Sequence, residues 1–280
     1  MHSMIEAINR RISVRTYSTR PIEEDKKQRI VDLLHANHEG PFGHNVRFAL
    51  IDFSQIEKDE IKTLGTYGVI SGAGLYIVSA VKAAPRAMED LGYCLEKVVL
   101  TATTMGLGTC WMGGTFRRAS FAKRISVSEG EVVPAVSPIG YPREKRSIRD
   151  NALRRFAGSD QRKTWDELFF DGEMKTPLSK DAAGNYATAL ECVRLGPSAS
   201  NNQPWRILRQ KDNTLHFYVK RTAGYDKVMR SVDLQLIDMG IAMCHFELAA
   251  RETGLTGRWK EAKPDLAVGK AEYVVSWTPS

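Results

Sequence analysis

Two long apolar segments dominate the pattern of hydrophobic and polar positions along the chain. They cover residues 90–111 and 238–259. Read at 3.6 residues per turn, each is apolar around most of its circumference, as in a helix enclosed by a protein core. Each helical stretch stops at a glycine, Gly106 or Gly254, and a short strand-like run follows. The pattern therefore predicts two buried helices of about five turns, each leading into a strand.

The two segments also align with each other without a gap. A second pair of segments, 20–41 and 176–197, matches upstream at constant spacing. Each reads as a proline-started amphipathic helix that ends at Gly-Pro. Two matched helices in the same order indicate an internal duplication, with halves at 1–155 and 156–280. The identical pairs in the long segments are Asp90/Asp238, Gly92/Gly240, Leu100/Leu248, Ala102/Ala250, Gly106/Gly254, Leu107/Leu255 and Trp111/Trp259.

Several shorter runs rich in β-branched and aromatic residues are typical of strands. They cover residues 46–53, 75–81, 215–220 and 271–277. Combined with the matched helices, they predict an α+β fold in which sheets are sandwiched between helices. The two halves would share a long helical interface.

Composition and charge exclude several classes of protein. The 280 residues are 42% hydrophobic, enough for a large core, and no run approaches the roughly 20 apolar residues of a membrane span. The N-terminus lacks the apolar core of a secretory signal, so we expect a cytoplasmic protein. Basic and acidic residues are interspersed, so the net charge of +7 favours a solvated surface over nucleic-acid binding. The four cysteines are widely separated and suggest no metal site.

The first segment with candidate chemistry is R-I-S-V-R-T-Y, residues 11–17. In an extended chain, Arg11, Ser13 and Arg15 would lie on one side of the segment. Guanidinium and hydroxyl donors arranged in this way suit a phosphate group. The alternative is a solvated basic cluster that follows a short helix.

The second segment is G-P-S-A-S-N-N-Q-P-W, residues 196–205. Its small, turn-forming residues would let the backbone approach a ligand and would offer N–H and side-chain donors to it. The alternative is an ordinary loop between a helix and a strand, with Trp205 as a core anchor. Residues 106–114, G-L-G-T-C-W-M-G-G, and 139–149, I-G-Y-P-R-E-K-R-S-I-R, add a glycine-rich turn and a basic stretch.

Together these four segments resemble the FMN-dependent nitroreductase family over most of the chain. The resemblance implies an α/β/α sandwich and an FMN that is bound by residues of two subunits. Because the motifs lie in different halves here, the chain resembles a fused pseudo-dimer, for which a monomer is plausible. The resemblance implies these cofactor-binding residues: Arg11, Ser13, Arg15, Met112, Gly113, Gly114, Lys145, Arg146, Arg149, Pro197, Ser198, Ala199, Asn201 and Gln203. Which of Lys145, Arg146 and Arg149 would contact phosphate stays open.

The resemblance also implies a ping-pong reaction. NAD(P)H would deliver hydride to flavin N5, beside the backbone of Gly113 and Gly114, and a nitro, quinone or related small acceptor would then be reduced. No side-chain catalyst is required, because the cofactor supplies the chemistry. The alternative is a flavin-binding protein for storage or sensing, without NAD(P)H turnover.

The counterparts of the two motifs in the opposite halves have diverged. At the repeat offset, residues 167–171 contain two carboxylates and no arginine, and residues 40–48 lack the paired serines. We therefore predict one FMN per chain.

Overall fold

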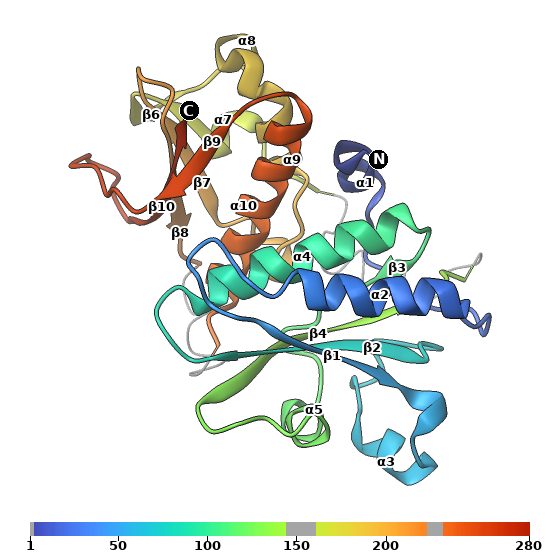
Figure 1. Ribbon diagram of the computed structural model, residues 1–280. Coiled ribbons are helices and arrows are strands. Elements are labelled where there is room, and N and C mark those ends of the chain that lie inside the picture. The colour runs from blue at the N-terminus through green and yellow to red at the C-terminus, as the bar shows by residue number, and fades with distance from the viewer. Residues whose placement is uncertain (1–2, 144–160, 223–231) are drawn as a thin grey trace.

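Two sheets flank a pair of long crossing helices in the computed structural model, which describes residues 3–143, 161–222 and 232–280 (Figure 1). The first half has the order α1 (Met4–Arg10), α2 (Glu24–Ala36), β1 (Arg47–Asp52), η1 (Phe53–Gln55), α3 (Lys58–Thr63), β2 (Leu75–Lys82), α4 (Ala87–Thr104), β3 (Gly108–Thr109), α5 (Arg118–Arg124) and β4 (Glu131–Gly140).

The second half repeats the main elements of this order. Its elements are α7 (Trp165–Leu168), β5 (Phe169–Asp171), β6 (Glu173–Pro177), α8 (Lys180–Ala183), η2 (Gly184–Tyr186), α9 (Ala187–Arg194), η3 (Ala199–Asn201), β7 (Trp205–Arg209), β8 (Leu215–Lys220), α10 (Leu234–Glu252), β9 (Gly257–Lys260) and β10 (Ala271–Pro279).

Both sheets share one topology. The first has the order β1-β2-β4-β3 and the second contains β7-β8-β10-β9, and each neighbouring pair in these runs is antiparallel. The second sheet continues past β7 with β5 and β6. Equal strand order around equivalent helices confirms the α+β fold and its internal duplication into a pseudo-dimer.

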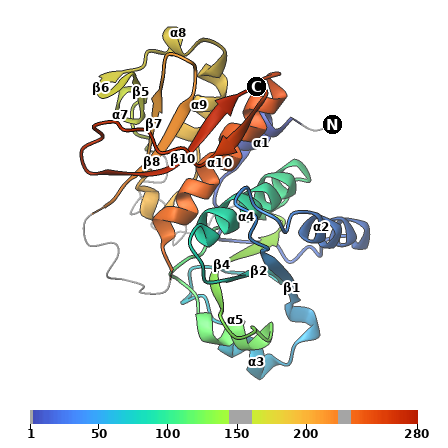
Figure 2. The same cartoon turned by 60° about the vertical axis from the view of Figure 1, so that its left-hand side comes forward.

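The matched glycines explain how the two long helices meet. A Cβ atom on Gly92 of α4 would lie 2.1 Å from the carbonyl oxygen of Ile237. One on Gly240 of α10 would lie 1.9 Å from the carbonyl oxygen of Glu89. The helix backbones therefore touch at their glycines, between the two sheets (Figure 2). Gly106 and Gly254 end the helices with left-handed φ values of 76° and 82°, as the pattern predicts.

A buried polar seam also joins α4 to α10. The matched tryptophan of each half donates to a glutamate on the long helix of its own half, and that glutamate also bonds the opposite helix. The bonds are Trp111 Nε1 to Glu96 and Trp259 Nε1 to Glu247, both 2.6 Å, with His245 Nε2 2.8 Å from Glu96 and Tyr93 Oη 2.9 Å from Glu247.

The prediction of a proline-started helix in the second half is wrong in detail. Pro177 ends β6, and the next helix begins after Ser179, whose hydroxyl accepts a hydrogen bond from the Ala182 N–H. Gly184, with φ of 54°, then divides the expected helix into α8, η2 and α9. The expected boundary between residues 155 and 156 lies outside the described residues.

Candidate cofactor site

The first motif lies beside β3. Ser13 forms a parallel bridge with Thr109, and the Val14 N–H donates to the Thr109 carbonyl at 2.8 Å. Val14 faces Gly108, where a Cβ atom would lie 2.6 Å from a Val14 methyl group. Since side chains alternate along extended backbone, Ser13 lies on the side of the segment opposite Val14. The placing of Arg11, Ser13 and Arg15 on one common side stays a prediction.

Helix α1, which precedes this motif, is fixed to the second half of the chain. Glu252, the last residue of α10, accepts hydrogen bonds from Ser3 Oγ at 2.5 Å and from the backbone N–H groups of Met4 at 2.7 Å and Ile5 at 3.1 Å. This carboxylate occupies the positive end of α1. Arg11 therefore starts from a helix that both halves hold, and its own side chain is buried.

The glycine-rich turn follows β3 directly. Met112 is buried and exchanges two backbone hydrogen bonds of 3.0 Å with Val136 of β4. The Gly113 carbonyl accepts from Arg118 Nη2 at 2.5 Å. A Cβ atom on Gly113 would lie 2.5 Å from a methyl group of Leu234, the first residue of α10. The turn therefore touches the second half, and the next residue along, Gly114, is exposed.

The second motif forms an unusual loop between α9 and β7. Ser200, Asn201 and Gln203 have left-handed φ values of 48°, 56° and 45°. Such conformations cost about 1–3 kcal/mol each in non-glycine residues and cluster at functional sites. The motif's own side chains stabilise them, because Ser198 Oγ accepts from the Gln203 N–H at 2.8 Å and Gln203 Nε2 donates to the Asn201 carbonyl at 3.0 Å.

The matched aspartates hold this loop and its first-half counterpart. Asp238 accepts the Ala199 N–H at 2.9 Å, and Asp90 accepts the N–H groups of Phe42 and His44 at 2.9 Å each. Burial raises the pKa of both carboxyl groups. The shared aspartate of the repeat is therefore an anchor for the loop that follows Gly-Pro.

The turn and the loop meet at the start of α10. Leu234, which touches Gly113, and Asp238, which binds Ala199, are four residues apart and so lie on one face of the helix, with Cβ atoms roughly 5–6 Å apart. The structure thus brings the turn at Gly113 and the loop at Ala199 to one face of α10, while Ser13 and Val14 pair with β3, which leads into the turn. Lys145, Arg146 and Arg149 lie outside the described residues.

A family model described as "Putative TM nitroreductase" matches residues 3–250. The chain belongs to this nitroreductase family. A "putative nitroreductase" from Thermotoga maritima MSB8 is 21% identical and has a TM-score of 0.63, with 99% of this chain and 93% of that one covered. A nitroreductase family protein from Clostridium novyi NT is 20% identical at a TM-score of 0.43, over 52% of this chain and 90% of that one. A search of curated proteins gave no match.

Neither a membrane-spanning helix nor a metal centre is found in the part of the chain that the structure describes. Within residues 3–143, 161–222 and 232–280, no helix has the length and apolar character to cross a membrane. The same ranges contain no group of three or more His, Cys, Asp or Glu residues placed to hold a metal ion. The four cysteines are buried and unbridged.

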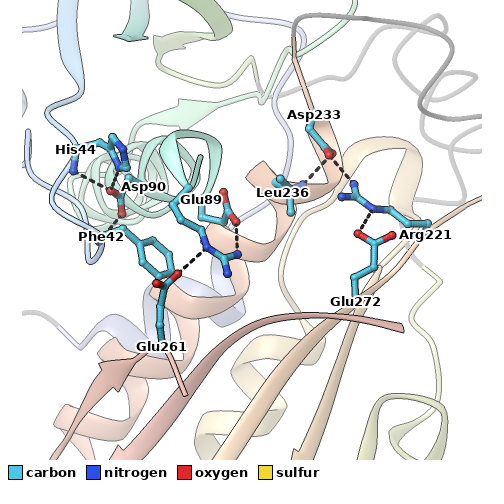
Figure 3. Close-up of polar contacts among 10 residues, drawn as sticks. Phe42, His44, Glu89, Asp90, Arg221, Asp233, Leu236, Glu261 and Glu272 are labelled. Carbon is cyan, nitrogen blue, oxygen red and sulfur yellow. Dashed lines mark hydrogen bonds and ion pairs between the residues drawn. The ribbon is translucent and has the colours of Figure 1, made fainter. Parts of the chain in front are cut away.

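The second pseudo-symmetric position of the nitroreductase is closed by ion pairs (Figure 3). The helix alignment places Arg86 opposite Leu234 and Glu261 opposite Gly113. Arg86 Nε lies 2.8 Å from Glu261 and Nη1 lies 3.0 Å from Glu89, and the guanidinium lies 5.4 Å from the centre of the Phe42 ring. An apolar contact at a glycine turn in one half is therefore replaced in the other by a network of ion pairs, in which Glu89 is buried and Glu261 is exposed.

The carboxylates of residues 167–171 do not explain this closure, contrary to the sequence interpretation. Glu167 accepts from the Thr164 N–H at 2.8 Å and caps α7, while Asp171 pairs with Arg209 at 3.0 Å. Strand β5 joins the β7 edge of its sheet, whereas the first motif joins β3 at the opposite edge of the repeated order. Residues 167–171 therefore match residues 11–15 in sequence offset but do not occupy the equivalent position in the fold.

A cavity of about 800 Å³ lies next to the closed position. It is bordered by the loop after β9 and by β8 and β10, and carboxylates of Glu261, Asp265 and Glu272 line it together with Arg86 and Lys263. Arg86 is already paired with two carboxylates. This lining does not suit a phosphate group.

Sequence reasoning missed the residues behind the second motif. Arg162, Lys163 and Arg206 all bond to residues 201–203. Arg162 and Lys163 precede α7, and Arg206 lies in strand β7. No motif marks them, because their contacts depend on the fold around the loop.

Proposed function

We propose that this nitroreductase binds one FMN between its two halves and passes two electrons from NAD(P)H to nitro, quinone or related small acceptors. The observation that carries the proposal is the meeting of Gly113 and Ala199 on one face of α10. Residues from both halves reach this point, as binding across a subunit interface requires. We also propose that the enzyme is a monomer, which the fused halves support, and that it is cytoplasmic with small molecules as its partners.

The donors in the site suit the groups of FMN. Arg11, Ser13 and Arg15 supply two guanidinium groups and a hydroxyl for the phosphate and for the polar edge of the ring. Lys145, Arg146 and Arg149 are further candidates for the phosphate. Pro197, Ser198, Ala199, Asn201 and Gln203 form the opposing wall, where Gln203 is 3% exposed and shapes the loop from within.

The flavin, when bound, supplies the capacity to accept hydride from a nicotinamide and to return it to an acceptor. Gly113 and Gly114 allow a flat ring to approach the backbone of the turn, because neither carries a Cβ atom. The positive charge of Arg15 would stabilise negative charge that develops on reduction. The strained loop and the anchored turn are held before binding, which lowers the cost of ordering them.

The visible absorption spectrum of the purified protein tests flavin binding. We expect bound FMN, and the double substitution Arg11→Ala/Ser13→Ala should release it. Arg10→Ala is the matched control, since Arg10 is exposed and one position away. Full flavin retention by the double variant would refute the site.

Oxidation of NADH or NADPH in the presence of menadione or a nitroarene tests the activity. Turnover by the flavin-loaded protein supports the proposal. Loaded protein that oxidises neither nucleotide with any acceptor would instead favour flavin storage or sensing.

A further inference from the structure

Lys163 holds the second motif from behind with its backbone and its side chain. Its N–H donates to Gln203 Oε1 at 2.8 Å. Its Nζ donates to the Asn202 carbonyl at 2.8 Å and to the Gln203 carbonyl at 3.3 Å. One residue therefore fixes both the side chain of buried Gln203 and the carbonyls on either side of the last left-handed turn.

Two arginines complete this support. Arg162 Nη1 donates to Asn201 Oδ1 at 2.8 Å, and Arg206 Nη1 donates to the carbonyls of Gln203 at 3.1 Å and Trp205 at 2.6 Å. These bonds reach residues whose φ values are left-handed. Left-handed conformations of these residues are unfavourable by themselves, so hydrogen bonds from residues outside the loop are needed to keep them.

Lys163, Arg162 and Arg206 also concentrate positive charge behind the loop. Arg206 is 7% exposed and Lys163 is half-buried, yet within the described ranges no carboxylate forms an ion pair with either. The charged groups that face Lys163 are Arg206 of β7, Lys220 at the end of β8 and Glu167 of α7. Buried cations without bonded anions are costly, and a bound anion would offset that cost.

We propose that Lys163, assisted by Arg162 and Arg206, is a positioning residue that keeps residues 198–203 in their binding conformation and favours an anionic flavin nucleotide there. The inference rests on the proposed function, in which this loop forms one wall of the FMN site. It assigns a role in cofactor affinity to three residues outside every motif of the sequence.

Titration of the flavin-free protein with FMN, followed by flavin fluorescence, tests this role. Lys163→Met should raise the Kd roughly ten- to hundredfold, as loss of hydrogen bonds from a charged donor does. Lys163→Arg keeps the donors and the charge and should stay within about threefold of the wild type. Lys220→Met is the matched control, because it removes a nearby charge without touching the loop, and should also stay within about threefold.

The pH dependence of the Kd gives a readout that a merely structural role would not move. Burial, and then the neighbouring Arg206, lower the pKa of Lys163 to about 8. An anionic ligand favours protonated Lys163, so wild-type affinity should fall as the pH rises through about 8. Lys163→Arg stays charged and should remove this fall between about pH 7 and pH 9.

The outcomes separate this inference from the proposed function. A wild type that binds no FMN at any pH refutes the proposed function. A wild type that binds FMN while Lys163→Met binds equally well refutes only the role of Lys163, as does a Lys220→Met variant that loses as much affinity as Lys163→Met. Identical pH profiles of the wild type and Lys163→Arg would also overturn it, and that comparison does not depend on the folding of Lys163→Met.

Discussion

Asp90 and Asp238 occupy one position of the repeat but make different numbers of contacts. Asp90 accepts from two backbone N–H groups and lies 2.9 Å from His44 Nδ1. Asp238 accepts one N–H, from Ala199, and its other oxygen is buried with no hydrogen-bond partner among the described residues. The copy in the candidate site is thus the less satisfied one, as is common where binding rather than stability shapes a residue.

This difference predicts unequal effects of Asp→Asn. Asp238→Asn keeps an acceptor for Ala199, so its free energy of unfolding at neutral pH should change by less than about 1 kcal/mol. Asp90→Asn turns an NH₂ group toward N–H donors of Phe42 or His44 and should lower the free energy of unfolding by about 1–3 kcal/mol. Chemical denaturation at neutral pH measures both, and equal losses would contradict the assignment.

The same aspartate predicts a pH effect. Burial raises the pKa of Asp238 well above its ordinary 3.8 in the folded state, so the folded protein holds this proton more tightly than the unfolded chain. The contribution of this group to stability therefore falls as the pH rises above 3.8 toward the folded-state pKa. Asp238→Asn should remove that part of the fall, which unfolding curves at acidic and neutral pH would reveal.

Sequence reasoning reached only some of the site residues, for a physical reason. Arg11, Ser13 and Arg15 form a local pattern whose alternation is visible in the sequence. Lys163 acts through contacts with residues about 40 positions away, and no local pattern encodes such a contact. What marks Lys163 is a half-buried ammonium group with no ion pair among the described residues, and only the folded structure shows this.

At the scale of elements, the crossing of α4 and α10 depends on two glycines. Alanine would normally favour a helix over glycine by about 1 kcal/mol. Gly92→Ala and Gly240→Ala should instead destabilise the protein by about 1–3 kcal/mol or more, because each new methyl group would overlap a backbone carbonyl. Thermal unfolding measures this, and a raised Tm for either variant would show that the helices can separate.

Elements with strong periodicity could be predicted and those set by capping could not. The two long helices and strand β8 lie where the pattern places them. The helix expected after Pro177 is broken, because Ser179 caps its start and Gly184 takes a left-handed conformation. Proline at such a position fits a strand end as well as a helix start.

For the whole molecule, the main expectation is one FMN per chain. The second position has Arg86, Glu89 and Glu261 where the first has an apolar contact at a glycine. The ratio of flavin to protein, from absorbance after exhaustive loading, should be near one. A ratio near two would show that the ion-pair network opens and that the pseudo-symmetry is functional.

The carboxylate of Glu252 at the start of α1 has a consequence for biosynthesis. A ribosome releases α1 and the Arg11 segment early, but the residue that caps α1 emerges some 250 residues later. We therefore expect a nascent chain to expose residues 11–17, the segment proposed to bind the FMN phosphate, without retaining the cofactor. Flavin binding would then follow translation, and a chain truncated before α10 would carry no flavin.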